Sequence, residues 1–371
     1  MKKSLLALAV AAALPAAAQA QSNVTLYGII DAAVEWTNAA ANATASGATT
    51  TGVGKSTLRV NSGYWASSRV GLRGTEPLGN SGMAAIFNIE HRFQVDTGAI
   101  QVGQAAGTAP YTALQAGSFW NGTAWGGLRT GMGEITLGRQ YTPAFYAMYF
   151  PDQTLNSGYN NWAAPTVATS VAPTGTSAIY GLVRADNSVM WTSPTIGGLQ
   201  LRAMWAPGAL AYNSTEINNA SAIALSNGSG DLHALSGVWR AGKLMVTGSY
   251  QKFDTQTGHQ DGWTVAGAYD FGAFGLSLGY SDLSFATYNV TSKLLSARVN
   301  VGAGKVYANV SQIDKSTAGD GLQIGVTYLQ DLSNRTAVYA GFGRNDNSGY
   351  GTGLGNESGK NRVSIGLRHL F

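Results

Sequence analysis

The chain has 371 residues, 49 of them glycine, and a formal net charge of +4 with only 11% charged side chains, against roughly 25% in soluble proteins. Its 44% hydrophobic content is too high for a disordered chain, and the absence of cysteine excludes a disulfide scaffold, a thiolate metal site and a cysteine nucleophile. The weak and scattered positive charge predicts no nucleic-acid partner.

The first twenty residues have the pattern of a secretory signal peptide. Lys2 and Lys3 precede an apolar run over 5–14, and an Ala-Gln-Ala motif ends at Ala20. The alternative is a membrane-anchoring helix, but the apolar run has about ten residues and a span needs about 20. We therefore expect cleavage after Ala20, export from the cytoplasm and a mature chain of residues 21–371.

The mature chain is predicted to consist of β-strands, because apolar and polar residues alternate along it. From Val24, the apolar residues Leu26, Val34 and Trp36 fall on one face, and Asp31 falls on the other. The same alternation marks three further segments, at 274–281, 293–301 and 321–328.

Short and long connections alternate between these strands. The short turns are predicted at 77–81, 130–133, 194–198, 241–242, 272–273, 302–304 and 331–334. The long polar loops are predicted at about 38–58, 96–117, 141–185, 208–230, 255–261, 285–292, 315–320 and 346–361. This division gives sixteen strands in eight hairpins.

Many antiparallel strands fit either soluble β-sandwiches or a closed transmembrane barrel. Soluble sheets carry charge on their outer face, and charge is scarce here. An even strand number, short periplasmic turns, long extracellular loops and aromatic residues near strand ends are typical of an outer-membrane barrel. We therefore predict an all-β, 16-stranded antiparallel barrel with a water-filled lumen, located in the cell outer membrane.

The last strand ends on an aromatic residue. Val363, Ile365, Leu367 and Phe371 alternate with polar or small residues, and Phe371 is the final residue. This ending resembles the signal that the barrel assembly machinery reads, and the alternative is an ordinary last strand. Expected partners are therefore this machinery, together with outer-membrane lipid and lipopolysaccharide.

Several segments in order along the chain resemble the Gram-negative general porins, especially the β-proteobacterial branch. These segments are 24–28, 68–79, 85–90, 127–129, 137–143 and 184–198, and the terminal Phe371 also fits. The resemblance implies a sixteen-stranded barrel, a homotrimer, a third loop folded into the lumen, and passage of small hydrophilic solutes and ions. A passive pore needs no catalytic group and no cofactor, and the four histidines, His91, His233, His259 and His369, are too far apart in sequence to predict a metal site.

The longest loop, 141–185, is the candidate constriction. Between Tyr141 and Val183 its only charged residue is Asp152, and Asp186 follows soon after. Four aromatic residues, at 145, 146, 149 and 150, stand near its start, where they could anchor the loop or line the opening.

Alternation also predicts which charged residues face the lumen. Val70 and Leu72 should face lipid, which turns Arg69 and Arg73 inward. The same argument turns Glu90, Arg92, Arg202 and Arg298 inward, since a charge at the lipid midplane costs about 2–4 kcal/mol.

The resemblance places basic wall residues of the constriction at Arg69, Arg139 and Arg184. Arg139 can face the lumen only if Gly138 marks a bulge or the strand has ended, because strict alternation turns it outward. The predicted constriction residues are Arg69, Arg73, Glu90, Arg139, Asp152 and Arg184. Such a ring predicts a mild anion preference, and the alternative is a solvated lumen face without a specific role.

Three other functions stay open at this point. Trp120, Trp125, Tyr159 and Trp162 would suit a channel specific for a sugar or an organic anion. A barrel enzyme would need a catalytic set, and the sequence has no G-x-S-x-G motif and no paired carboxylate motif. An adhesive barrel would have a plugged lumen.

Overall fold

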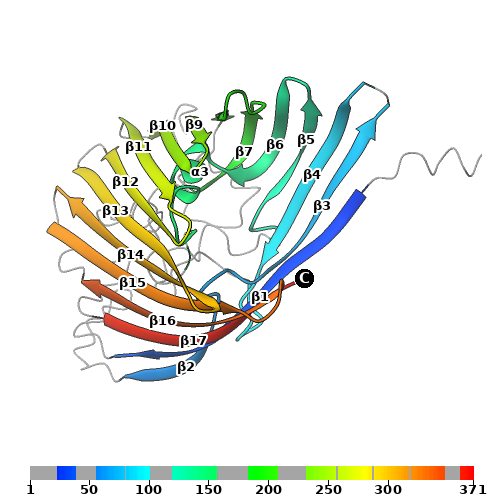
Figure 1. Cartoon of the computed structure of the whole chain (residues 1–371). Coiled ribbons are helices and arrows are strands. Elements are labelled where there is room, and N and C mark those ends of the chain that lie inside the picture. Colours follow the sequence, from blue (N-terminus) through cyan, green and yellow to red (C-terminus); the bar gives the residue numbers. More distant parts are fainter. Residues whose placement is uncertain are drawn as a thin grey trace, which may run out of the picture.

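The chain folds into a closed antiparallel β-barrel in the computed structural model (Figure 1). The structure describes residues 23–38, 56–79, 81–100, 119–155, 157, 183–207, 231–255, 258–285, 288–316, 319–346 and 360–371. The signal peptide predicted for residues 1–20 lies outside the described residues. Strands that follow one another in the chain lie side by side, and β1 pairs with β17 to close the barrel.

The strands and the helix have the following bounds. The first part of the barrel contains β1 Asn23–Thr37, β2 Thr57–Ser62, β3 Arg69–Leu78, β4 Met83–Arg92, β5 Ala124–Thr130, β6 Gly133–Tyr141, α3 Pro143–Tyr149, β7 Arg184–Thr192, β8 Leu199–Ala206 and β9 Leu232–Ala241. The second part contains β10 Leu244–Thr255, β11 Gly258–Asp270, β12 Phe274–Phe285, β13 Tyr288–Val301, β14 Gly304–Lys315, β15 Gly319–Asp331, β16 Thr336–Asp346 and β17 Lys360–Leu370.

The barrel has sixteen strands, as predicted, because β2 and β3 are two parts of one barrel strand. The first part of β1 pairs with β3, and its last part pairs with β2. Residues 63–68 interrupt this strand and turn inward, where the Tyr64 ring stacks on Tyr339 of β16 at 5.2 Å between centroids.

The predicted alternation is present in the strands. Leu278 is 66% exposed and Ile365 is 65% exposed on the outer face. Their neighbours Ser277 and Ser364 are buried on the inner face. Apolar side chains on the outside and small polar ones inside are the arrangement that a barrel in lipid requires.

The last residue helps to close the barrel. The backbone N–H of Gly28 donates to the Phe371 carbonyl at 3.0 Å, and the Phe371 N–H donates to the Gly28 carbonyl at 3.1 Å. The Phe371 ring occupies the space where a Cβ of residue 28 would stand. Glycine is therefore required at position 28 for this ring to lie flat on β1.

Connections follow the predicted order of short turns and long loops, with two differences. β10 and β11 reach Thr255 and Gly258, and β12 and β13 reach Phe285 and Tyr288, so the loops predicted at 255–261 and 285–292 are largely strand. Cross-strand hydrogen bonds continue beyond the apolar band. Residues on both faces are polar there, so the sequence no longer alternates between apolar and polar residues and does not predict a strand.

The third long connection begins with a helix that alternation did not predict. Thr142 caps α3, accepting from the Phe145 N–H at 3.2 Å, and Pro143 occupies its first turn. The helix lies inside the barrel (Figure 1) and packs on β8, β9, β10 and β11. No helix in the described part of the chain is long and apolar enough to cross a membrane.

Candidate functional site: an arginine cluster on the inner wall

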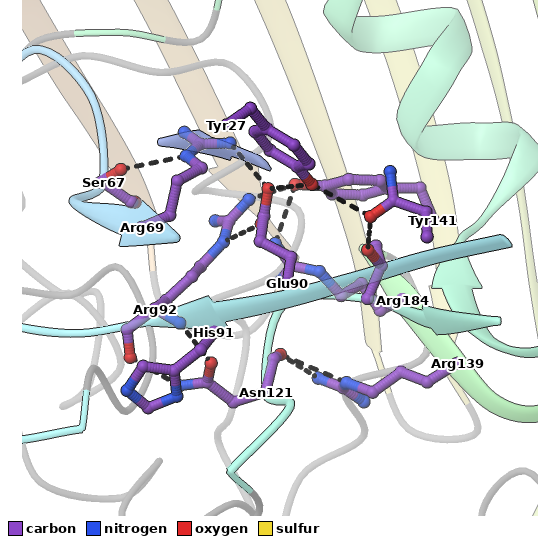
Figure 2. Close-up of polar contacts among 12 residues, drawn as sticks. Tyr27, Ser67, Arg69, Glu90, His91, Arg92, Asn121, Arg139, Tyr141 and Arg184 are labelled. Carbon is purple, nitrogen blue, oxygen red and sulfur yellow. Dashed lines mark hydrogen bonds and ion pairs between the residues drawn. The ribbon is translucent and has the colours of Figure 1, made fainter. Parts of the chain in front are cut away.

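Neighbouring strands bring three arginines and one acid together on the inner wall (Figure 2). In the register, Gly71 of β3 lies opposite both Tyr27 of β1 and Glu90 of β4, and Arg69 lies opposite Arg92. Residues directly opposite each other share a face of the sheet, so these side chains all point into the barrel.

Glu90 is the acceptor at the centre of this cluster. It is 5% exposed, and its Oε1 accepts from Arg92 Nε at 2.8 Å. Its Oε2 accepts from Tyr27 Oη at 3.3 Å and from Arg69 Nη1 at 3.5 Å. The carboxylate therefore fixes both guanidinium groups against the wall.

Tyr141, at the end of β6, joins a third arginine to the cluster. Its hydroxyl accepts from Arg184 Nη2 at 2.8 Å and also from Arg92 Nη2. The Arg184 guanidinium carbon lies 4.4 Å from the centroid of the Tyr141 ring, which is a cation–π contact. The Tyr141 ring thus contacts the Arg184 guanidinium group, which forms no ion pair with a carboxylate among the described residues.

Arg139 is connected to this cluster but does not point into it. The strand register shifts between Gly138 and Gln140, and Gly138 has φ 127°, so the bulge that the sequence required is present. Arg139 forms an ion pair with Asp186, and its Nε donates to the Asn121 carbonyl at 3.2 Å. Figure 2 shows Arg139 with His91 on the other side of β4 from Glu90.

The remaining two predicted constriction residues lie outside the cluster. Arg73 is exposed on β3, with its guanidinium carbon 5.4 Å from the Tyr27 ring centroid. Asp152 is 1% exposed and accepts from the Thr154 backbone N–H at 3.0 Å and from the Thr154 hydroxyl at 2.8 Å. The structure thus brings Arg69, Glu90 and Arg184 together, and their role in a constriction stays a prediction.

The loop start crosses the lumen beside the cluster. Thr247 of β10 donates to the Ala147 carbonyl at 2.7 Å, and Gln153 donates to Ser277 and Ser296 of β12 and β13 at 3.0 Å each. Residues 158–182, which hold the rest of the predicted constriction loop with Tyr159 and Trp162, lie outside the described residues.

Helix α3 carries the aromatic residues that anchor the loop start. Tyr141 stacks on Phe145 at 4.4 Å between ring centroids, and Phe145 stacks on Tyr149 at 5.5 Å. Burial raises the pKa of Tyr146 to about 12 and also raises the pKa of Tyr149. Both hydroxyl groups therefore stay neutral at physiological pH and add no negative charge beside the wall.

The cluster can attract anions. Arg69, Arg92 and Arg184 contribute three positive charges and Glu90 one negative charge, whereas Arg139 is balanced by Asp186. Buried Nε of Arg184 has no hydrogen-bond partner among the described residues. The cluster thus holds a net positive charge. Among the described residues, no group of three or more acidic or histidine side chains is arranged for a metal ion.

Alternation turns Arg92 inward, but the predicted constriction set does not contain it. That set also lacks Tyr27, Asn121 and Tyr141. Tyr27 carried a usable signal, since it faces the lumen by the same alternation as Asp31. Tyr141 lies in the segment 137–143 that resembles the porin family, but the resemblance gave it no role. Asn121 carried no signal, because it lies before the start of β5, where the period of two stops.

The family model described as "Gram-negative porin" matches residues 7–350. The chain is 29% identical to outer membrane porin protein 32 of Delftia acidovorans over 405 residues, and 27% identical to an outer membrane porin protein of Bordetella pertussis over 426 residues; both comparisons cover all of each chain. A solved structure described as an anion-selective porin from Comamonas acidovorans superposes with a TM-score of 0.74 at 23% identity, covering 95% of this chain and all of that one.

Proposed function

The chain belongs to the Gram-negative porin family, and from that premise we propose that its channel passes small anions in preference to cations. It is an outer-membrane β-barrel that serves as a channel for passive diffusion. The proposal concerns which ions and solutes this channel favours.

The arginine cluster is the observation that carries the proposal. Arg69, Arg92 and Arg184 point into the barrel against the single carboxylate of Glu90. Rings of arginine at a narrow point favour anions, because fixed positive charge lowers the barrier for an anion and raises it for a cation. The Comamonas acidovorans neighbour is described as anion-selective, and we extend the same preference to this chain.

A planar-bilayer recording under a KCl gradient tests this proposal. We expect a reversal potential on the anion side for the purified protein. Replacing Arg184→Gln removes one unpaired charge and should move the potential toward zero, whereas Arg335→Gln, in an exposed short turn, should leave it unchanged. A cation-selective wild-type channel would refute the proposal.

We further propose that residues 1–20 are removed on export and that residues 21–371 form the mature barrel. The apolar outer face suits contact with lipid and lipopolysaccharide, and Phe371, paired with Gly28, suits recognition of the last strand by the barrel assembly machinery. The family resemblance implies a homotrimer, and because this family consists of channels we infer that the chain is not an enzyme.

A further inference from the structure

A cavity of about 380 Å³ lies on the inner wall beside the arginine cluster, toward the short turns. Its floor is formed by inward residues of β5, β6, β7 and β8, and Tyr146 of α3 forms part of its lining. This volume is within the range of about 300–1,000 Å³ that is typical of small-molecule sites. The function proposed above does not use this cavity.

Arg202 of β8 is the charged group that is built into the cavity wall. It is 7% exposed, and its guanidinium carbon lies 4.4 Å from the Tyr146 ring centroid and 5.5 Å from that of Phe150. Its Nη2 donates to Gln200 Oε1 at 2.6 Å, and its buried Nη1 has no hydrogen-bond partner among the described residues. A guanidinium stacked on aromatic rings keeps its N–H edge for an oxyanion.

The rest of the lining selects among oxyanions. Arg129 and Glu134 face the cavity as an ion pair of 2.6 Å, so the net charge of the lining with Arg202 is one positive charge. Trp125 and Met190 add apolar surface. A single carboxylate matches that charge, and an apolar body attached to it would cover Trp125 and Met190, whereas phosphate would meet Glu134 with a second negative charge.

We propose that this cavity is a separate binding site for a small organic carboxylate with a planar apolar body. The carboxylate accepts from Arg202, and the body packs on Trp125 and Met190. This inference rests on the proposed function, since an anion must enter the lumen to reach the cavity.

Calorimetric titration of the purified, folded full-length protein with sodium benzoate at constant ionic strength tests the site. We expect saturable binding that Arg202→Gln weakens by about tenfold or more, because a charge-assisted hydrogen bond is lost. Trp125→Leu should weaken benzoate binding by about threefold and leave binding of inorganic phosphate unchanged. The matched control is Arg298→Gln, an inward arginine of β13 paired with Asp270, which should leave benzoate binding unchanged.

Three results would overturn the site: no saturable benzoate binding, an equal loss in Arg298→Gln and Arg202→Gln, or phosphate binding more tightly than benzoate without dependence on Trp125. Reversal potentials measured on the same preparations separate the two proposals. An anion-selective channel that fails to bind benzoate overturns only the site, whereas a cation-selective channel overturns the proposed function. Trp125→Leu keeps the test decisive if Arg202→Gln does not fold.

Discussion

Glu90 determines how much of the wall charge is cancelled. Its side chain is 7% exposed, and among the described residues it is the only carboxylate that forms an ion pair with Arg69 or Arg92. Replacing Glu90→Gln should therefore raise the anion preference in a bilayer recording, since the net charge of the cluster increases by one. It should also destabilise the folded barrel by about 3–5 kcal/mol, because a buried guanidinium loses its partner.

A matched control for this variant is Glu76→Gln, an exposed acid of β3 outside the cluster. Both effects should be absent there, with stability measured by urea titration in lipid vesicles. An anion preference that stays the same or decreases in Glu90→Gln would contradict the assignment of the field to this cluster.

The orientation of single residues was predictable wherever the period of two is unbroken. The alternation correctly predicts that four charged side chains point into the barrel, those of Arg69, Arg73, Glu90 and Arg202. It could not decide Arg139, because the bulge at Gly138 shifts the register at that residue. The sequence therefore predicts which charged side chains face the lumen, but it does not predict the contacts of residues at strand ends.

Residues 63–68 connect the two sides of the barrel closure. The Asp31 carboxyl group of β1 accepts from the Ala66 backbone N–H at 2.9 Å and from the Tyr339 hydroxyl of β16 at 2.6 Å. Tyr64 and Thr327 of β15 share a hydrogen bond of 2.7 Å. The segment therefore joins β1 to β15 and β16 across β17.

Removing one hydroxyl tests whether the hydrogen bond between Tyr339 and Asp31 stabilises the closure. Tyr339→Phe keeps the ring stacked on Tyr64 but loses the bond to Asp31, and it should lower the free energy of unfolding by about 1–3 kcal/mol. Tyr328→Phe loses an exposed hydroxyl on the outer face and should change it by less than about 0.5 kcal/mol. Equal losses in urea titrations of the two variants would show that the Tyr339–Asp31 hydrogen bond adds no stability.

The strands were predictable as elements, whereas helix α3 and residues 63–68 were not. A helix of seven residues is too short to show a period of 3.6. The contacts of residues 63–68 are distant in sequence, as with Tyr64 and Thr327, which are 263 residues apart. A sequence pattern describes one element at a time, and these contacts arise only when the barrel closes.

At the scale of the whole molecule, the proposed anion preference comes from a local electric field rather than from the net charge. The full chain carries only four excess positive charges, of which Lys2 and Lys3 belong to the predicted signal peptide. Of the six ionisable residues predicted for the constriction, Arg69, Glu90 and Arg184 meet on one side of the barrel, formed by β3, β4 and β7. Within this predicted set, the charge is therefore concentrated on one wall.

Such a field is screened by salt, which predicts how selectivity depends on concentration. The Debye length falls from about 30 Å at 0.01 M to about 3 Å at 1 M salt, so ions far from the wall lose the influence of Arg69, Arg92 and Arg184 as KCl increases. The anion-to-cation permeability ratio from reversal potentials should therefore approach one at 1 M KCl, and Arg184→Gln should lie closer to one than the wild type at low salt. A ratio that stays constant from 0.01 to 1 M KCl would mean that the preference comes from direct binding or size, because neither of these requires a long-range field.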